Sequence, residues 1–301
     1  MKNESDNFNI DFIGIGVERA GTTWIFECLK EHPQICGSNY KEVKFFSKKT
    51  QFKGEDDKYQ RGINYYASYF QHCLNKQIKG EFSPHYFYEK ESARRIKKHF
   101  PKVKLILCLR NPIERAYSAF CFEKSRRKVN YDNFNEAINN EFDYFIKDGF
   151  YSKNLEYYFN LFPKENILIL IYENALKNPI DFILKIYKFL EVDESFIPQK
   201  AKARINTPHN KNEFRIFLSA LILKTKIFLT KFKIGRNLVN WSEKKGAGNL
   251  LHRILEKRKK TLEKVQKKSM DSQTRKHLQH IYQSEIQKIE KITGKDLSLW
   301  Q

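Results

Sequence analysis

The chain has 301 residues, 41% of them hydrophobic and 15% aromatic, with 12 glycines and 8 prolines. This composition excludes collagen-like, low-complexity and largely disordered chains, and the length allows a sizeable core in one large domain or two small ones. Lysine and arginine number 56 against 35 aspartates and glutamates, so the net charge is +21. The positive field favours an anionic partner without identifying it.

The sequence also bears on targeting and redox state. The N-terminal segment MKNESDNFNIDF is polar and acidic, unlike a secretory signal, and no run of about 18 apolar residues predicts a membrane span. There is no CxxC pair, and the five cysteines are Cys28, Cys36, Cys73, Cys108 and Cys121. Because three of them lie in apolar patterns, we expect reduced, mostly buried thiols, a cytoplasmic location and no zinc site.

Strands and helices are predicted to alternate along the first two thirds of the chain. Nearly continuous apolar runs predict buried strands at residues 12–16, 103–109 and 167–172, and a weaker signal marks residues 78–82. Helical patterns fall between the strands, at residues 22–31, 89–99, 113–125, 152–162 and 179–190. This alternation predicts an α/β fold, with a P-loop-like central parallel sheet flanked by helices.

Basic helical patterns replace the strand signals after about residue 198. They are predicted at residues 213–233, 250–268 and 272–292. We interpret residues 8–301 as a single domain, with an α/β core at 8–198 and a helical extension at 199–301. For the basic helices at residues 213–268 three roles stay open from the sequence: they cover the sheet, rest on an anionic membrane surface or line an acceptor groove for a polyanionic sugar.

The first predicted strand runs into a glycine-rich loop, Gly16-Val-Glu-Arg-Ala-Gly21-Thr22-Thr23-Trp24. Two glycines five apart, followed by a hydroxyl residue that opens a helix, are typical of a loop whose backbone N–H groups bind phosphate. Nucleoside triphosphatases carry Lys at the position of Thr22, whereas the cation here is Arg19. The loop therefore predicts a nucleotide 5′-phosphate site without the metal–triphosphate machinery.

This loop resembles the 5′-phosphosulfate loop of sulfotransferases that use 3′-phosphoadenosine 5′-phosphosulfate (PAPS). Many members carry Lys at the Arg19 position, and Arg also occurs there in the wider superfamily. The resemblance implies that Arg19 contacts the bridging oxygen, that the loop holds the 5′-phosphate and that Trp24 packs on adenine. The cofactor-binding residues implied in this loop are Arg19, Ala20, Gly21, Thr22, Thr23 and Trp24.

A second anion motif follows the strand predicted at 103–109. That strand ends in Arg110, Pro112 suits a helix start, and Ser118 lies about two turns along this helix. A cation at a strand end and a hydroxyl on the next helix make a plausible second anion site. In the sulfotransferase pattern, Arg and Ser at this spacing hold the 3′-phosphate of PAPS.

The acceptor side is predicted from two further segments. Lys-Glu42-Val-Lys44-Phe-Phe resembles the KExxFF element of carbohydrate and bacterial-type sulfotransferases, in which the Glu is the general base. Neighbouring cations keep such a carboxylate ionised. The segment at residues 80–87 resembles the family's next loop, although some members have Lys at the Phe82 position. We expect Lys44 and His85 to contact the acceptor, and His85 is also a rival base.

The resemblance spans about residues 10–300 and implies sulfuryl transfer from PAPS, with release of PAP, to a hydroxyl or amine. It favours a carbohydrate or glycolipid acceptor and requires no metal. Glu42 would deprotonate the acceptor, and Arg19 would stabilise charge on the leaving nucleotide. The alternatives are a P-loop nucleotide or sugar kinase and a non-enzymatic basic protein that binds RNA or membranes. No RNA-binding signature is visible, so no nucleic acid partner is expected, and we place the protein in the cytoplasm, including the membrane periphery.

Overall fold

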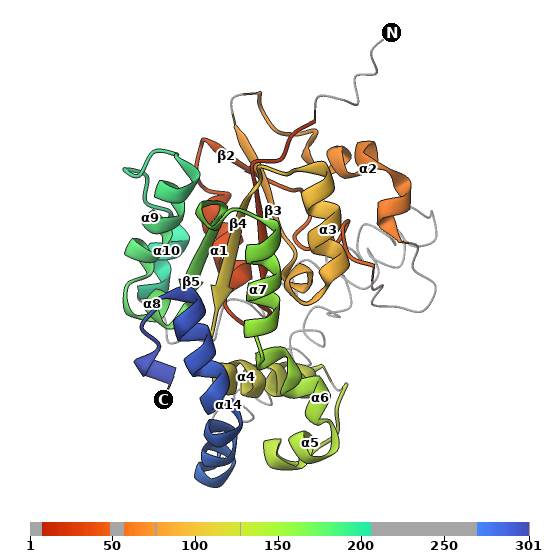
Figure 1. The fold of residues 1–301 in the computed structure, drawn as a ribbon. Coiled ribbons are helices and arrows are strands. Elements are labelled where there is room, and N and C mark those ends of the chain that lie inside the picture. The colour runs from red at the N-terminus through yellow and green to blue at the C-terminus, as the bar shows by residue number, and fades with distance from the viewer. Residues whose placement is uncertain (1–7, 49–56, 76, 127, 206–269, 301) are drawn as a thin grey trace, which may run out of the picture. The chain divides into compact units, whose positions relative to one another are not determined.

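A computed structural model of the protein describes residues 8–48, 57–75, 77–126, 128–205 and 270–300. Its centre is a five-stranded sheet in the order β2-β3-β1-β4-β5, and each neighbouring pair is parallel (Figure 1). The strands are β1 (Phe12–Gly16), β2 (Ile35–Gly37), β3 (Ile78–Phe82), β4 (Lys104–Leu109) and β5 (Ile167–Ile171). The predicted α/β fold with a central parallel sheet is therefore confirmed.

Glycines and phenylalanines interlock between β1 and β3. Phe12 lies opposite Gly80 and Gly14 lies opposite Phe82. A Cβ atom built on Gly14 would lie 2.1 Å from the Phe82 ring, and one on Gly80 would lie 2.1 Å from the Phe12 ring. Each aromatic ring thus occupies the space that a side chain on the opposite strand would need. This interlock fixes the register that brings the carboxyl ends of the two strands together.

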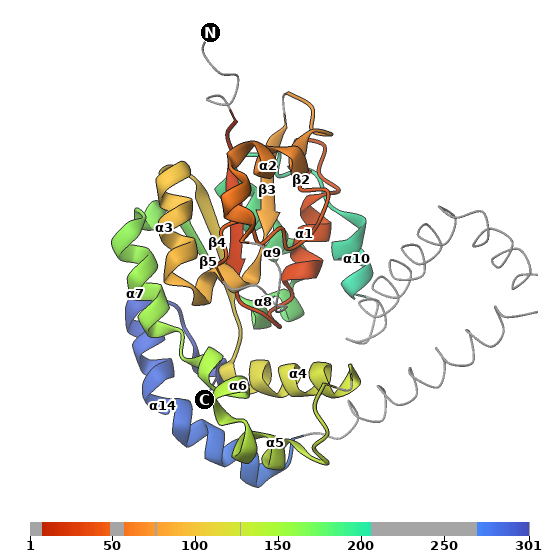
Figure 2. The same ribbon diagram turned by 90° about the vertical axis from the view of Figure 1, so that its right-hand side faces the viewer.

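Helices cover both faces of the sheet. In the two views α1, α9 and α10 lie together on one face, and α3 and α7 lie on the other (Figures 1 and 2). The longer helices are α1 (Thr22–Leu29), α3 (Lys90–His99), α4 (Pro112–Ser125), α7 (Ser152–Leu161), α9 (Pro179–Leu190) and α14 (Ser272–Thr293). The shorter ones are α2 (Ile63–Ala67), α5 (Phe134–Asn140), α6 (Phe142–Phe145), α8 (Tyr172–Lys177) and α10 (Gln199–Ile205). None of the helices in the described part of the chain is long and apolar enough to cross a bilayer.

Helix α14 belongs to the same compact unit as the sheet, although it is far away in the sequence. This unit takes in Met1–Phe120, Tyr131–Ile205 and Met270–Gln301, whereas Cys121–Asn130 belong to a second unit. Glu285 on α14 is 3% exposed and accepts hydrogen bonds from Ser152 N (2.6 Å) and Ser152 Oγ (2.9 Å) at the start of α7. The buried carboxylate therefore caps α7 and joins the two helices.

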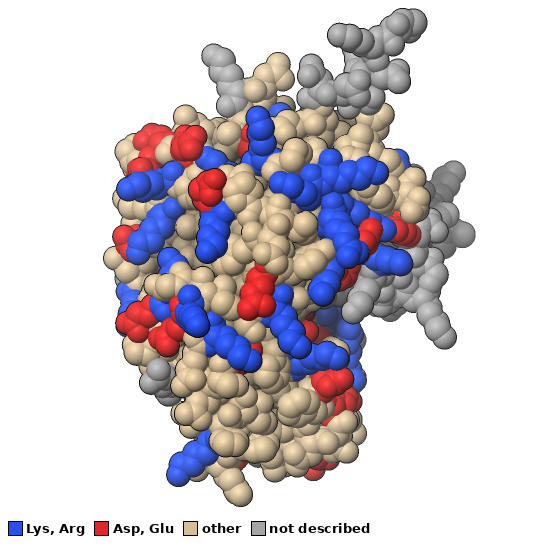
Figure 3. Space-filling view, viewed as in Figure 1, with Lys and Arg blue, Asp and Glu red and all other residues tan. Residues whose placement is uncertain are grey.

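The basic segments predicted at residues 213–233 and 250–268 lie outside the described residues. Their proposed contact with an anionic membrane, the division of the domain at residue 198 and the cytoplasmic location stay predictions. On the face seen in Figure 3, lysine and arginine side chains gather at the upper right, both signs of charge mix on the left, and the lower part carries few charges.

The prediction that all five cysteines are reduced is wrong for Cys36 and Cys73. Cys36 on β2 forms a disulfide with Cys73, and their Cα atoms are 5.7 Å apart. Cys28, Cys108 and Cys121 take part in no disulfide among the described residues and are buried, as predicted. No local spacing could predict this pair, because the fold brings together two cysteines 37 positions apart. The cysteines therefore no longer argue for a cytoplasmic location.

Candidate active site

The glycine-rich loop joins the end of β1 to the start of α1. Arg19 and Gly21 both adopt left-handed backbone angles, with φ of 66° and 73°. Gly21 packs against Tyr172 so closely that a Cβ atom there would lie 2.5 Å from the ring. The N-cap residue of α1, which begins at Thr22, is Gly21, whose lack of a side chain leaves the first N–H groups without the usual cap from that position. The first N–H groups of this helix therefore point toward the loop, where an anion would satisfy them.

The two predicted anion motifs meet at Arg19. Its Nε donates to Ser118 Oγ at 3.2 Å, and Arg110 Nη1 donates to the Arg19 carbonyl at 2.7 Å. The Arg110 guanidinium lies 4.9 Å from the centre of the Tyr172 ring. Its Nε is buried and has no hydrogen-bond partner among the described residues. A buried N–H without an acceptor is costly, so an anionic ligand beside Arg110 fits this arrangement.

A second layer of contacts holds Arg110 in place. Tyr151 OH donates to the Arg110 carbonyl at 3.0 Å. The carboxylate of Glu173 accepts from Asn111 N and from Trp300 Nε1, both at 3.0 Å. Trp300 is 1% exposed, although it lies near the C-terminal end of the sequence. The tail after α14 thus supports the turn that carries Arg110, a contact that the sequence motifs did not suggest.

Trp24 lies on α1, next to the loop. Its indole Nε1 donates to the Lys200 carbonyl at 3.2 Å, and its ring centre is 5.9 Å from that of Phe182. These contacts fix the ring between α9 and α10. Packing of Trp24 on an adenine base stays a prediction.

Glu42 lies between two lysines. Its carboxylate is 3.1 Å from Lys41 Nζ and 3.4 Å from Lys44 Nζ, and its side chain is 34% exposed. Burial raises the pKa of Glu42, but the charges of Lys41 and Lys44 outweigh this effect, and the pKa lies below its ordinary value. Glu42 N donates to the carbonyl of Phe82 at 2.9 Å, so the segment lies beside the end of β3.

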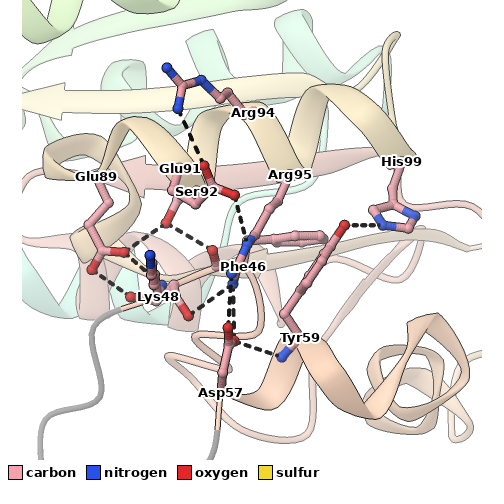
Figure 4. A network of polar contacts seen from close by, with 11 residues as sticks. Phe46, Lys48, Asp57, Tyr59, Glu89, Glu91, Ser92, Arg94, Arg95 and His99 are labelled. Atoms are coloured by element: carbon pink, nitrogen blue, oxygen red, sulfur yellow. Dashed lines mark hydrogen bonds and ion pairs between the residues drawn. The ribbon is translucent and has the colours of Figure 1, made fainter.

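The segment that follows Glu42 is anchored to α3. Ser47 Oγ donates to the Glu89 carboxylate at 2.5 Å, and Lys48 N donates to the same group at 2.9 Å. Ser92 Oγ donates to the Phe46 carbonyl at 3.1 Å (Figure 4). The position of the whole KExxFF element is therefore set by the sheet edge and by α3.

Arg95 on α3 extends this anchoring to residue 57, on the far side of residues 49–56. Its guanidinium makes two hydrogen bonds to the Asp57 carboxylate, at 2.8 and 3.0 Å, and lies 4.2 Å from the centre of the Tyr59 ring (Figure 4). Lys48 and Asp57 are thus both held on α3. The bidentate geometry makes this one of the stronger ion pairs of the molecule.

His85, the rival base, is paired with a residue that the sequence reasoning missed. Its Nε2 lies 3.0 Å from the carboxylate of Glu18, inside the glycine-rich loop. Burial raises the pKa of Glu18, but His85, Lys44 and Arg115 lower it to about 2. The structure therefore brings His85 and Lys44 close to the glycine-rich loop. An acidic residue inside an anion-binding loop was the available signal, because it needs a cationic partner.

Metal ligands are few in the described ranges. The one group of Cys, His and acidic side chains close enough to share an ion there is Cys36, His72 and Cys73. Two of its three ligand atoms are the sulfurs of the disulfide. The Arg19–Arg110 region instead offers cations and N–H donors, the chemistry of an anion site.

Comparison with known proteins is consistent with this geometry. Residues 9–216 match a family model described as a sulfotransferase domain. The chain belongs to this sulfotransferase family. The match confirms the resemblance read from the two anion motifs and from the KExxFF element.

Curated sulfotransferases match part of the chain. Human heparan sulfate glucosamine 3-O-sulfotransferase 6 is 28% identical over 185 residues, which is 58% of this chain and 50% of that protein. The membrane-associated sulfotransferase kil1 of Dictyostelium discoideum is 34% identical over 115 residues, which is 37% of this chain and 22% of that protein. The chain thus spans about half the length of the heparan sulfate relatives that it matches.

A solved sulfotransferase shares the fold. The crystal structure of a sulfotransferase from Alicyclobacillus acidocaldarius aligns with a TM-score of 0.58 and 22% identity, over 72% of this chain and 92% of that chain. The likeness supports the arrangement of the parallel sheet and its helices.

Proposed function

We propose that this sulfotransferase-family protein transfers a sulfuryl group from PAPS to a hydroxyl or amine of a carbohydrate or glycolipid. The observation that carries the proposal is the 3.2 Å contact between Arg19 and Ser118, which joins the two anion motifs. A nucleotide with phosphates at both its 5′ and 3′ positions needs two such motifs side by side. ATP, the donor of the alternative kinase, carries no 3′-phosphate.

The donor supplies the sulfuryl group, and the residues around Arg19 hold its phosphates. The N–H groups at the start of α1, with Thr22 and Thr23, bind the 5′-phosphate. Arg110 and Ser118 bind the 3′-phosphate, where the buried Nε of Arg110 gains an acceptor. Arg19 stabilises negative charge on the oxygen that leaves with the nucleotide, because a fixed cation in a shielded site is preorganised for that charge.

Glu42 is the proposed general base. A sugar hydroxyl becomes a good nucleophile only as its proton leaves, and Glu42 accepts that proton on its carboxylate. Lys41 and Lys44 lower its pKa, which keeps the carboxylate ionised at neutral pH. Lys44 also lies close enough to Glu18 to interact electrostatically with the donor loop. Glu42 itself also interacts electrostatically with Glu18, so the proposed base lies near the loop proposed to hold the donor.

His85 is the second candidate for the base. The observation in its favour is the Glu18 carboxylate 3.0 Å from Nε2, because a carboxylate partner fixes the orientation of an imidazole. In this alternative a small phenol or alcohol is the acceptor, and Glu42 only helps to bind it.

The proposal of a carbohydrate acceptor is based on the curated relatives. The named 3-O-sulfotransferases act on the glucosamine of heparan sulfate. By analogy, we propose that the acceptor is a glycan with free hydroxyl or amino groups.

A transfer assay with ³⁵S-labelled PAPS tests the proposal. The acceptors are a fully desulfated, N-acetylated heparin oligosaccharide, its N-deacetylated form and p-nitrophenol. We expect label in an oligosaccharide without added Mg²⁺, and thermal stabilisation by PAP that exceeds stabilisation by AMP. Label only in p-nitrophenol would favour the His85 alternative. Stabilisation by ATP with Mg²⁺ but not by PAP would instead support the kinase.

A further inference from the structure

Glu81 at the end of β3 is a buried carboxylate that none of the roles above uses. Its side chain is 0% exposed. One oxygen accepts from Tyr86 OH at 2.8 Å and from Tyr66 OH at 3.2 Å, and the other accepts from Ser83 Oγ at 2.7 Å. The amide of Val43 also donates to this carboxylate. A buried acid that receives four donors and has no cationic partner in these contacts calls for a functional explanation.

These contacts connect Glu81 directly to the backbone that carries Glu42. The residue after Glu42 is Val43, whose N–H binds the carboxylate. Lys44 N donates at 3.0 Å to Ser83 Oγ, whose own proton goes to Glu81. The two residues after Glu42 are therefore both tied to Glu81 through their backbone amides. The Val43 amide binds its carboxylate directly, and the Lys44 amide binds it through the Ser83 hydroxyl.

The backbone of this turn needs such support. Glu42 and Lys44 adopt left-handed angles, with φ of 62° and 54°. This conformation is unfavourable for residues with a Cβ atom and persists when surrounding contacts impose it. The two amides bound through Glu81 lie at Val43 and Lys44, within the turn. The carboxylate is thus placed to hold the conformation that aims the Glu42 side chain.

We propose that Glu81 is a positioning residue for Glu42, and that its ionised carboxylate holds the turn in the geometry needed for proton abstraction. This inference rests on the proposed function, in which Glu42 is the general base. Protonation removes the negative charge that strengthens the hydrogen bonds from Val43 N and Ser83 Oγ, and a neutral carboxyl group holds these donors less tightly. The turn then loosens although Glu42 itself is still ionised.

The surroundings of Glu81 place this titration near neutral pH. Burial raises its pKa to about 7, and its hydrogen bonds only partly offset that effect. The titratable groups that interact with it are Tyr66 from α2, Tyr69 from the turn that follows α2 and Tyr86 from the turn after β3, and the pKa of each is raised above its ordinary value. On the adjacent strand β1, Ile13 lies opposite and carries no charge. Glu81 is therefore the group of this cluster that titrates near pH 7.

Two opposite pH dependences follow. Turnover should fall as the pH drops through about 7, although the pKa of Glu42 lies below its ordinary value. Between the unfolded pKa of about 4.5 and the folded pKa of about 7, the folded chain binds more protons, so this group lowers stability as pH rises. A residue with a purely structural role would make stability and activity rise and fall together.

The test compares wild type with Glu81→Gln, which keeps the shape of the side chain but not its charge. We expect kcat at pH 8 to fall about 10- to 100-fold, as misalignment of a reacting group does, and the acid limb near pH 7 to disappear. The affinity for PAP should stay the same, and the unfolding temperature at pH 8 should stay at or above that of wild type. Loss of turnover together with a lower unfolding temperature would overturn the proposal.

Two further variants keep the proposal testable if Glu81→Gln does not fold. Tyr66→Phe removes one donor to the charged form, so the acid limb should move to higher pH. Ser83→Ala removes the acceptor of Lys44 N and should lower kcat in the same direction as Glu81→Gln. An acid limb that stays in place in Tyr66→Phe, or an unchanged kcat in Ser83→Ala, would contradict the proposal.

Amide hydrogen exchange separates this inference from the proposed function. Peptides that contain Val43 and Lys44 should exchange slowly in wild type and faster in Glu81→Gln, while peptides from β4 stay unchanged. If wild type transfers no sulfate at all but exchange follows this pattern, the proposed function fails and the support by Glu81 stands. If exchange is the same in both proteins, Glu81 does not position the turn, whatever the reaction.

Discussion

Arg19 Nε donates a hydrogen bond of 3.2 Å to Ser118 Oγ across 99 positions of sequence. The first residue lies in the loop after β1, and the second lies on the helix after β4. Because β1 and β4 are adjacent parallel strands, their carboxyl ends place both motifs at one edge of the sheet. The contact joins the two segments that the sequence separately predicted to bind anions.

Replacing Arg110 should weaken the binding of PAP selectively. In Arg110→Ala we expect the affinity for PAP to fall about 10- to 100-fold, because a charge-assisted hydrogen bond contributes about 1.5–3 kcal/mol. The affinity for AMP, which lacks the 3′-phosphate, should change little. Isothermal calorimetry with both nucleotides measures the difference. Arg94→Ala is the matched control, since Arg94 is 62% exposed on α3. Equal losses for PAP and AMP would remove Arg110 from the 3′-phosphate site.

Glu42→Gln should lose proton abstraction and keep donor binding. A positioned base contributes about 10²- to 10⁴-fold, so we expect kcat to fall by that factor while the Kd for PAP stays unchanged. Steady-state transfer from labelled PAPS and calorimetry give the two values. His85→Asn is the companion variant. Near-normal turnover in Glu42→Gln with collapse in His85→Asn would reverse the two roles and favour a small-molecule acceptor.

Trp300→Phe should both destabilise the fold and weaken the binding of PAP. The variant removes the 3.0 Å hydrogen bond to the Glu173 carboxylate, a bond to a charged group that contributes about 1.5–3 kcal/mol. Urea unfolding measures the loss of stability. The affinity for PAP should also fall, because Glu173 holds Asn111 beside Arg110. Leu299→Ala is the control, since Leu299 is 50% exposed. A similar loss of affinity in the control would argue against this relay.

The Cys36–Cys73 disulfide predicts a thiol count and an effect of reductant. Protein unfolded without reductant should titrate three thiols, from Cys28, Cys108 and Cys121, and five after reduction. Reduction should lower the free energy of unfolding by about 3–5 kcal/mol for cysteines 37 positions apart. A Cys36→Ala/Cys73→Ala double variant should be insensitive to the reductant. Five thiols before reduction would restore the original prediction of reduced cysteines.

The sequence predicted the strands that are long and apolar. β1, β4 and β5 stand out because both sheet faces are covered, which makes their residues almost continuously hydrophobic. β2 was missed because Ile35–Gly37 spans only three residues, too few to show a period. The short helices α5 and α6 were missed for the same reason. The end of α14 was predicted within one residue, because its apolar positions repeat over 22 residues.

The site was predicted where a motif is local and missed where it depends on pairing. Arg19 and Ser118 were each predicted from their own segment. The pairing of Glu18 with His85 and the burial of Glu81 depend on loops that meet only in the folded chain. Glu81 follows a glycine in a weak strand, and nothing in its immediate neighbours distinguishes it from a surface carboxylate. Such contacts follow from the sheet order and not from spacing along the chain.

The left-handed backbone at Glu42 and Lys44 affects any attempt to improve this protein by directed evolution. Residues with a Cβ atom lose roughly 1–2 kcal/mol in that conformation, whereas glycine adopts it freely and asparagine tolerates it. A library selected only for heat resistance would therefore enrich glycine or asparagine at positions 42 and 44. The first variants selected from it would lack the proposed base, so every round of selection needs a turnover assay in addition to the stability screen.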